Sequence, residues 1–271
     1  MKTDMNRIVG GHDLVWIVLD SLRYDVADRQ MREGRTPNLA AWFPGGWEKR
    51  HSPASFTYPA HQAFFAGFLP TPAEPHAVAD RLLALRFTGS KTTGRETCVL
   101  DGADIVSGLA ARGYHTLCIG GVGFFNKMTP LSRVLPGYFM ESHWSSKTGV
   151  TSKTSAEEQF ALAARRLGEI PTDQRVFLFL NISAIHRPNR HYLPGKKDDD
   201  LETHAAALRH VDTCLPVLAD ALQRRAPAHL LAFSDHGTLY GEDGFHGHRV
   251  GHPDVYTVPY AATMLTPDPS C

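Results

Sequence analysis

The chain has neither an excess of charge of one sign nor a long apolar segment. Among its 271 residues, 28 basic side chains balance 28 acidic ones, so no overall positive field attracts nucleic acid or an anionic membrane. No apolar run approaches the ~18 residues of a membrane-spanning helix, and no apolar leader segment precedes the first run. We therefore expect a cytosolic protein that binds neither nucleic acid nor a membrane; the oligomeric state is left open.

Cysteine is scarce, and its spacing excludes two classes of small domain. The four cysteines are Cys98, Cys118, Cys214 and Cys271. They form no CxxC pair or other close spacing, so neither a zinc ribbon nor a disulfide framework is predicted. With 42% hydrophobic and 21% charged residues, the chain has ample material for a large core. Because no linker or repeat divides it, residues 1–271 are predicted to form a single domain.

Apolar runs of strand length alternate with helical patterns along the chain. Nearly continuous apolar runs are typical of strands that are buried on both faces of a parallel sheet. The predicted strands are Leu14–Leu19, Tyr114–Ile119, Val176–Ile182, Leu230–Phe233 and Tyr260–Leu265. Helices are predicted after Ser21 through Arg32, around Ala77–Leu85, and over Asp101–Arg112, Ser155–Gly168 and Leu201–Arg225. This order predicts an α/β fold, a three-layer α/β/α sandwich with a mostly parallel central sheet.

Local signals refine the helix ends and the connecting segments. Ser155 and Glu158 have the spacing of a capping box, and Pro216 is expected to kink the last long helix. The Gly-rich stretch 120–123 lacks the strand–GxGxxG–helix order of a dinucleotide site and is interpreted as a loop at the sheet edge. Residues 124–154 show little periodicity, which suits either an insertion that shapes a pocket or a plain surface loop.

The stretch Asp235-His236-Gly237 arrives at the end of the predicted strand Leu230–Phe233. Open α/β sheets bind ligands and metals at the ends of their strands. A carboxylate oxygen beside an imidazole nitrogen is half of a site for Zn²⁺ or Mn²⁺. An isolated Asp-His pair is weak evidence, so the other half of the site must come from elsewhere in the chain.

Two other segments offer oxygen ligands. Asp20 directly follows the predicted strand Leu14–Leu19, although it would also suit the N-cap of the next helix. Thr57 falls at or next to the N-cap of a helix that has Pro59 in its first turn and Gly67 at its end. A hydroxyl at that position lies at the positive end of the helix dipole, which favours an alkoxide or an anion. Capping alone is the alternative role for Thr57.

The Gly-broken stretch 244–253 contains His246, His248 and His252. Its glycines predict a loop, which is free to fold back over the end of the Asp235 strand. An ordinary exposed loop is the alternative. An imidazole in this loop would either ligate a second cation or act, neutral or protonated, on a bound anion and its leaving group.

As an ordered set, these segments resemble the alkaline phosphatase superfamily, in its sulfatase and phosphoethanolamine-transferase-like branch. The resemblance runs through most of the chain, and no single motif carries it. The matching segments are Val18–Arg23, Thr36–Leu39, Phe56–His61, Gly67–Pro70, Arg112–Thr116, His186–Pro188, Val211–Asp212, Phe233–Gly237 and Gly241–Glu242. The resemblance implies the three-layer fold of that superfamily.

The resemblance also implies a metal ion held by Asp20, Thr57, Asp235 and His236, with Thr57 as the nucleophile that takes the transferred group. The residues themselves agree, because carboxylates and an imidazole at strand ends and a hydroxyl at a helix start can converge on one cation. Such a cation would lower the pKa of the hydroxyl and polarise a phosphoryl group. Mixed nitrogen and oxygen ligands favour Zn²⁺ or Mn²⁺ over Ca²⁺.

The nucleophile segment departs from the sulfatase pattern. True sulfatases carry Cys or Ser in a C/S-x-P-x-R signature that is modified to formylglycine, whereas this chain reads Thr57-Tyr-Pro-Ala-His61. Threonine cannot give that aldehyde, which argues against sulfate-ester hydrolysis. The double Asp of many sulfatases is Asp20-Ser21 here, and no carboxylate precedes His186. A complete second metal site is therefore not expected, although a second ion is left open.

Two histidines take the place of the second metal in the single-metal transferases of this superfamily, where they hold the phosphoryl oxygens. His186 matches the first, and His248, twelve residues after His236, matches the second by spacing. The rivals for the second position are His246 and His252. The resemblance thus implies catalytic roles for His186 and His248 beside Thr57.

These observations predict a metal-dependent hydrolase of phosphate mono- or diesters that works through a Thr57 adduct on a small-molecule substrate. The alternatives are a phosphoethanolamine-like transferase to a soluble acceptor, a sulfatase-like esterase, and an inactive relative that uses the fold for binding. The missing transmembrane anchor argues against a lipid-envelope substrate. The intact set of predicted metal ligands argues against an inactive relative. One ion per chain is expected, and the substrate itself is not predicted.

Overall fold

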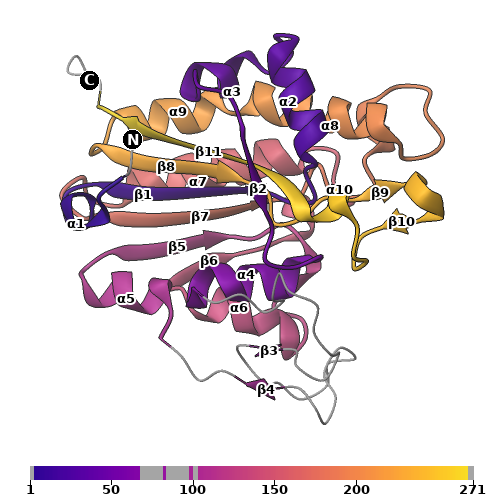
Figure 1. The fold of residues 1–271 in the computed structure, drawn as a ribbon. Helices are drawn as coiled ribbons and strands as arrows, with labels where there is room; N and C mark the ends of the chain where they lie inside the picture. The colour runs from indigo at the N-terminus through magenta and orange to yellow at the C-terminus, as the bar shows by residue number, and fades with distance from the viewer. Residues whose placement is uncertain (1–2, 68–81, 84–97, 100–102, 268–271) are drawn as a thin grey trace.

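The computed structural model describes residues 3–67, 82–83, 98–99 and 103–267 (Figure 1). The helix expected around Ala77–Leu85 and the loop expected after it lie largely outside these residues, as does Cys271. Within the described part of the chain, no helix is both long and apolar enough to cross a membrane. Helices lie on both sides of a central sheet, so the predicted α/β/α sandwich is confirmed.

Seven strands form the central sheet among the described residues. In spatial order they are β2 (Glu48–His51), β11 (Thr257–Leu265), β8 (Ala228–Phe233), β1 (Asp13–Leu19), β7 (Val176–Ile182), β5 (His115–Ile119) and β6 (Glu141–His143). Only β11 pairs antiparallel with its neighbours, so the predicted mostly parallel sheet is confirmed. Short pairs outside this sheet are β9 (Leu239–Tyr240) with β10 (His246–Gly247), and β3 (Leu82–Leu83) with β4 (Cys98–Val99).

The α-helices of the described residues agree in position with most of the predicted ones. They are α1 (Met5–Ile8), α2 (Tyr24–Arg32), α3 (Pro37–Trp42), α4 (Thr57–Ala66), α5 (Ile105–Ala111), α6 (Val134–Gly137), α7 (Ser155–Glu169), α8 (Leu201–Cys214), α9 (Pro216–Gln223) and α10 (Pro253–Tyr256). The predicted capping box at Ser155 is wrong, because Thr154 is the N-cap and makes no side-chain capping bond. Pro216 begins a separate helix rather than kinking one, since proline suits the first helical position.

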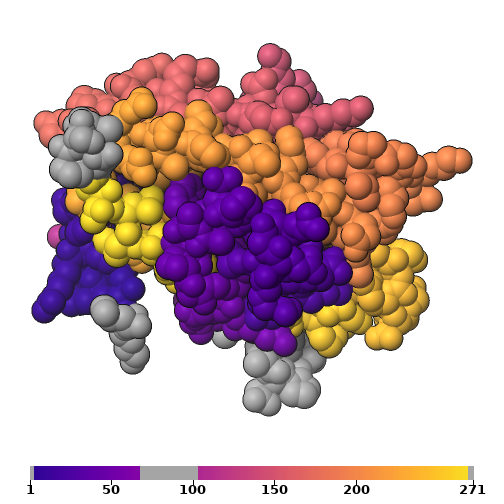
Figure 2. Space-filling model, turned by 90° about the horizontal axis from the view of Figure 1, so that it is seen from above, coloured from indigo at the N-terminus to yellow at the C-terminus, as the bar shows by residue number. Residues whose placement is uncertain are grey.

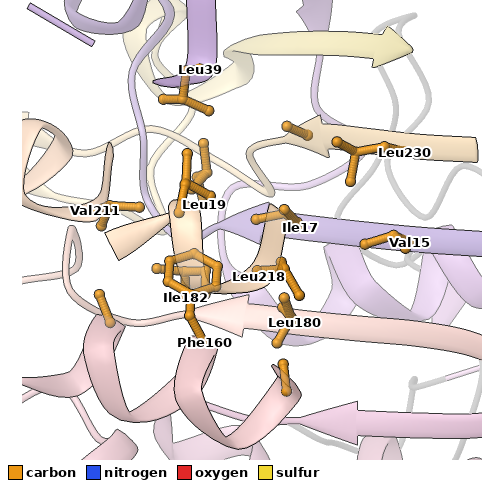
Figure 3. Close-up of a cluster of buried hydrophobic side chains, with 14 of the residues drawn as sticks. Val15, Ile17, Leu19, Leu39, Phe160, Leu180, Ile182, Val211, Leu218 and Leu230 are labelled. Carbon is orange, nitrogen blue, oxygen red and sulfur yellow. The ribbon is translucent and has the colours of Figure 1, made fainter. Parts of the chain in front are cut away.

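Each face of β1 packs into a separate hydrophobic core. Val15, Ile17 and Leu19 belong to the core that β1 shares with α7, α8 and α9 (Figure 3). Leu14 and Val18 belong to the core on the other face, with residues of α4, α5 and α6. Because side chains alternate across a strand, a strand covered on both faces needs a nearly continuous apolar run. That requirement explains why the sequence reveals β1 so clearly.

The strand register brings the carboxyl ends of the central strands to one edge. Leu19 pairs with Ile182 of β7, and Val18 pairs with Phe233 of β8. The residues that follow these strands therefore meet at the same edge of the sheet. This is the edge at which open α/β sheets bind ligands.

Asp212 of α8 joins helix α3 to the rest of the fold. Its Oδ1 accepts a hydrogen bond of 2.8 Å from the backbone N–H of Leu39, and its Oδ2 accepts one of 3.1 Å from Asn38 Nδ2. Figure 2 shows the indigo surface of α2 and α3 beside the orange surface of α8 and α9. Two of the family-like segments, Thr36–Leu39 and Val211–Asp212, therefore meet in one structural contact.

Two predictions about connecting segments are corrected by the sheet order. The Gly-rich stretch 120–123 is a loop at the carboxyl end of β5, but β5 is not the outermost strand of the sheet, because β6 lies outside it. A Cβ on Gly121 would lie only 2.4 Å from the backbone oxygen of Asn181, so glycine is required by close packing against β7. Residues 124–154 are more than a pocket insertion or a surface loop, because they include the edge strand β6.

Candidate active site

Three buried side chains meet at the carboxyl ends of β1 and β8. They are Asp20, Asp235 and His236, each 0% exposed, and one ligand atom from each lies within 4.8 Å of the others. His236 Nε2 lies 3.5 Å from Asp235 Oδ2 and 3.9 Å from Asp20 Oδ1. The fold thus brings together the strand-end residues that the sequence nominates as metal ligands.

Ser21 fixes the orientation of both carboxylates. Its backbone is in the left-handed region, with a φ of 68°, which is uncommon for a residue other than glycine. Its N–H donates to Asp235 Oδ1 over 3.1 Å, and its hydroxyl donates to Asp20 Oδ1 over 3.0 Å. Capping is not the role of Asp20, because Arg23 is the N-cap of α2. The turn after β1 instead holds two carboxylates toward one point.

Thr57 is the first residue of α4, and its side chain faces this cluster. Its hydroxyl oxygen lies 3.4 Å from Asp20 Oδ2 and 3.3 Å from His236 Nε2, and the residue is 2% exposed. The capping alternative is wrong, because Phe56 is the N-cap and α4 has no side-chain capping bond. Gly67 ends the helix with a φ of 70°, as its position in the sequence predicts.

The position of the proton on His236 follows from its partners. His236 Nδ1 lies 2.8 Å from the carbonyl oxygen of Gly237, which can only accept, so Nδ1 carries the proton. The lone pair of Nε2 then faces the carboxylates and the hydroxyl of Thr57. Gly237 is required by close approach rather than by a bend, since a Cβ there would lie 1.9 Å from the backbone oxygen of Asp254.

His186 and His248 lie beside the cluster, and the two rival histidines do not. The ring centroid of His248 is 4.5 Å from that of His236 and 5.5 Å from that of His186. His246 is exposed in β10. His252 is the N-cap of α10, where its Nδ1 accepts a backbone hydrogen bond. The loop therefore folds back over the end of the Asp235 strand, with His248 as the inward residue.

His61 is a member of the site that the sequence reasoning did not assign. It is fully buried; its Nδ1 donates to the backbone oxygen of Thr57 over 2.7 Å and lies 3.7 Å from Asp235 Oδ2. Its Nε2 has no hydrogen-bond partner among the described residues. His61 stands where the sulfatase signature has arginine, and that departure was the available signal.

Asn181 is the second residue that the sequence reasoning missed. Its Nδ2 donates to Asp20 Oδ2 over 3.0 Å, and its Oδ1 accepts from the backbone N–H of Val122 over 3.0 Å. The residue is 0% exposed and lies within β7. One amide in an otherwise apolar strand was the signal, because a buried polar side chain needs partners.

Arg23 connects the turn after β1 to the segment that carries His248. Its guanidinium lies 2.8 Å from Asp25 and 3.2 Å from Asp254, and it also pairs with Glu242. Two more of the family-like segments, those ending in Arg23 and Glu242, are thus held together. These ion pairs hold both ends of residues 242–254 over the carboxyl ends of the strands.

The two carboxylates of the site influence each other's ionisation. Burial raises the pKa of Asp235 well above its usual range, and the neighbouring Asp20 carboxylate raises it further. Burial also opposes ionisation of Asp20, but the electrostatic interaction with His186 and His236 and the hydrogen bond from Asn181 lower the pKa of Asp20 overall. Without a cation, Asp235 therefore keeps its proton to a higher pH than Asp20 does.

Burial keeps two histidines of the site, His61 and His248, neutral when no ligand is bound. Burial lowers the pKa of His61 to about 4. Burial, with the neighbouring His236 and His186, lowers the pKa of His248 to about 3. A neutral His248 donates or accepts a hydrogen bond but does not carry a permanent charge.

The donor set suits a divalent cation. Asp235 Oδ2 is buried and has no hydrogen-bond partner among the described residues, and His236 Nε2 presents a lone pair to the same point. Two carboxylates that repel each other in a dry pocket would both be neutralised by one dication. Oxygen and imidazole ligands together are typical of Zn²⁺ and Mn²⁺ sites.

No protein-family model and no curated protein matches the chain, but solved structures do. The C-terminal periplasmic domain of phosphoethanolamine transferase EptC from Campylobacter jejuni is 13% identical, with a TM-score of 0.60 over 94% of this chain and 79% of that one. A protein of the alkaline phosphatase superfamily from Vibrio parahaemolyticus is 18% identical, with a TM-score of 0.59 over 95% of this chain and 60% of that one. The EptC domain from Escherichia coli, in complex with Zn, is 13% identical, with a TM-score of 0.59 over 93% and 72%.

These similarities confirm the predicted resemblance at the level of the fold. The chain spans 60% of the Vibrio protein and 72 to 79% of the two EptC domains. The similar structures contradict one expectation, that of a cytosolic protein, because the EptC domains are periplasmic. That expectation rested on the lack of an apolar leader and of a spanning segment, neither of which determines where a folded domain works.

Proposed function

We propose that this chain, which has the fold of the alkaline phosphatase superfamily, is a metal-dependent hydrolase of phosphate mono- or diesters. One observation carries the proposal: a buried hydroxyl, that of Thr57, lies 3.3 to 3.4 Å from two of three clustered metal-ligand candidates. A threonine held only by packing would not need a carboxylate and an imidazole beside its oxygen. The substrate is a small-molecule phosphate ester.

Asp20, Asp235, His236 and Thr57 would hold the cation, which lowers the pKa of the Thr57 hydroxyl and polarises the phosphoryl group. The deprotonated Thr57 oxygen attacks phosphorus, so an Oγ–P bond forms as the bond from phosphorus to the leaving oxygen breaks. The leaving oxygen takes up a proton and departs as an alcohol. Water then attacks phosphorus in the Thr57 adduct and restores the hydroxyl, which releases phosphate from a monoester substrate or a phosphate monoester from a diester substrate.

His186 and His248 would divide the remaining roles. His248, kept neutral by burial, donates a hydrogen bond to a phosphoryl oxygen. His186 is less buried, and its Nδ1 donates to the carbonyl of Arg187, which leaves Nε2 available to the substrate. In the protonated imidazole, Nε2 carries the second proton and can deliver it to the leaving oxygen. Asn181 and Ser21 position Asp20 without touching the substrate.

Zn²⁺ or Mn²⁺ is the proposed cofactor, with one ion in this site. The imidazole among the ligands makes the site a poor match for Ca²⁺, which prefers oxygen ligands throughout. The EptC domain of Escherichia coli was solved with Zn, which supports zinc as the first metal to test. A periplasmic or extracellular location is proposed on the same comparison.

The runner-up is a transferase that passes a phosphoethanolamine-like group from Thr57 to an acceptor other than water. The similar EptC structures are domains of phosphoethanolamine transferases, which favours this second candidate. Both candidates share the adduct and differ only in what removes it.

The test is a panel of phosphate monoesters, phosphate diesters and sulfate esters, assayed with Zn²⁺, Mn²⁺ and Ca²⁺ after chelation. Turnover of phosphate esters with Zn²⁺ or Mn²⁺ and release of the phosphoryl group to water would support the hydrolase. Turnover that starts only when an alcohol acceptor is added would identify the transferase. Hydrolysis of sulfate esters alone, or activity that persists after chelation, would reject both proposals.

A further inference from the structure

A second group of metal-ligating side chains lies between α7 and α8, and it shares no residue with the candidate active site. Glu157 comes from α7, while His210 and Cys214 come from successive turns of α8. One ligand atom from each lies within 4.8 Å of the others. Among the described residues, this trio and the active-site trio are the two such groups.

Two of the ligand atoms lie close to the third, a ring nitrogen of His210. His210 Nε2 lies 2.9 Å from Glu157 Oε2 and 4.0 Å from Cys214 Sγ. Histidine and cysteine four residues apart lie on the same face of a helix, so the pair is available as a two-point ligand without any change of fold. The Tyr192 ring lies 4.7 Å from the His210 ring and limits its rotation.

We infer that Glu157, His210 and Cys214 form a second transition-metal site, with a position left open to water or a fourth ligand. Thiolate and imidazole ligands with one carboxylate select Zn²⁺ and its spectroscopic substitute Co²⁺ over Ca²⁺ or Mg²⁺. Separations of 2.9 and 4.0 Å bracket the roughly 3.5 Å between neighbouring ligands of a tetrahedral zinc ion. A small rotation of the Glu157 side chain, which is 44% exposed, would complete the geometry around the more restricted His210 ring.

Two other roles for this trio are less consistent with the structure. A reactive or redox-sensing cysteine needs a lowered pKa, whereas burial and the neighbouring Glu157 raise the pKa of Cys214 to about 11. Without a metal, His210 pairs with Glu157, and the Cys214 thiol donates to the backbone oxygen of His210 over 3.2 Å, so the sulfur and the imidazole are not used together. A bound ion would displace the thiol proton and use all three.

The bound ion would join α7 to α8. Helix α8 also carries Asp212, which holds the Asn38–Leu39 backbone, and His204, whose Nε2 accepts from the backbone N–H of Arg23. The proposed metal site therefore lies on the helix that also contacts the turn after β1, through His204 and the backbone of Arg23. Its occupancy should raise the thermal stability of the chain without supplying a group to the reaction.

The test is a CoCl₂ titration of the reduced, full-length chain, followed by absorption spectroscopy. A thiolate-to-cobalt charge-transfer band is expected, because Cys214 is a sulfur ligand and the active-site cluster contains none. Cys214→Ser should remove the band and weaken Co²⁺ binding at this site by at least about tenfold, since even second-shell changes cost 10–100-fold. His210→Ala should do the same, and ZnCl₂ should bleach the band in the unmodified chain.

Two controls separate this inference from the proposed function. Asp235→Ala removes a ligand of the active-site cluster and should leave the band intact. Cys271→Ser, a change at another cysteine, should leave it intact as well. A chain that gives no band on titration, or a band that survives in folded Cys214→Ser protein, would overturn the second site while leaving the phosphoryl-transfer proposal untouched.

Discussion

The ring of His248 lies 4.5 Å from the ring of His236, centroid to centroid, although a Gly-broken loop separates the two residues. A loop residue is thus held against a strand-end ligand candidate. The pairs that Arg23 makes with Glu242 and Asp254 hold the loop in that place. The proximity makes His248 the one histidine of the loop that can reach an anion bound at the cluster.

We predict that His248→Ala lowers kcat by about 10²–10³-fold, because it removes a hydrogen-bond donor to the phosphoryl oxygens. The loss should be similar for good and poor leaving groups, since a neutral imidazole gives no proton. His186→Ala should instead lose more with poor leaving groups, as expected for an acid. The measurement is kcat for a series of aryl and alkyl phosphate esters. His252→Ala is the matched control, and its kcat should stay near that of the native chain. A large loss of kcat in His252→Ala with a near-normal kcat in His248→Ala would show that His248 is not the acting residue.

We predict that Asp235→Asn abolishes binding of the active-site metal. Elemental analysis of Cys214→Ser protein, which lacks the second site proposed above, should find one Zn²⁺ or Mn²⁺ per chain, and adding Asp235→Asn should reduce this to near zero. Asp243→Asn, a change in an exposed loop carboxylate, is the control. Unchanged metal content in the Asp235 variant would mean that the ligand set is misassigned.

The metal-free protein should show the repulsion between the two carboxylates as a dependence of stability on pH. Because the folded-state pKa of Asp235 is raised, the folded state holds a proton that the unfolded state has lost. This contribution is present at pH values below the unfolded pKa of about 3.8 and is lost as pH rises toward the folded pKa. In EDTA, the midpoint temperature of unfolding should therefore be lower at pH 8 than at pH 5. Asp235→Asn or added Zn²⁺ should reduce this difference. An identical pH profile for Asp235→Asn would contradict the coupling.

Glu141 predicts the opposite dependence on pH. Burial opposes its ionisation, but hydrogen bonds from Arg166, His143 and His115 lower its pKa to about 2, from a usual value of 4.5. Its stabilisation is therefore present above pH 4.5 and is lost as pH falls toward 2. Glu141→Gln should cost about 1–2 kcal/mol at neutral pH, less than the unscreened shift because its partners are partly exposed to solvent.

Urea unfolding at several pH values measures this effect. The difference between the native chain and Glu141→Gln should shrink as pH falls below 4.5. Glu158→Gln, which removes a carboxylate 4.0 Å from Lys147 on the surface, should change stability by no more than about 0.5 kcal/mol. A Glu141 variant whose deficit is constant with pH would contradict the assignment.

The sequence revealed the central strands because burial on both faces requires apolar residues throughout. It did not reveal the edge strands. β2 consists of Glu48–His51, all charged or titratable and exposed, and its pairing depends on β11 rather than on any pattern of its own. β6 has only three residues, all half-exposed, so it also lacks an apolar pattern of its own. Edge strands therefore need the sheet before they can be recognised.

The site divides in the same way. Asp20, Asp235 and Thr57 stand at the ends of elements that the sequence could predict, so their convergence was predictable from topology. His61 and Asn181 point into the site from within a helix and a strand, and their direction depends on packing that one sequence does not encode locally. Capping was a reasonable alternative for Asp20 and Thr57, and only the backbone geometry excluded it.

The covalent role of Thr57 gives the sharpest prediction for the chemistry. Thr57→Ala should lower turnover by several orders of magnitude while the fold remains and Asp20, Asp235 and His236 still hold the metal. The fold should persist because the side chain is not a helix cap and its truncation removes only a methyl group and a hydroxyl. Thr57→Ser keeps a hydroxyl at the same place and should retain part of the rate. Intact-mass measurement after a brief substrate pulse should find a phosphoryl adduct. Peptide mapping should place it on Thr57 in the native chain and on the same position in Thr57→Ser, and Thr57→Ala should carry no adduct there. Near-normal turnover of folded Thr57→Ala would exclude the covalent mechanism, and the phosphoryl group would then have to pass directly to water.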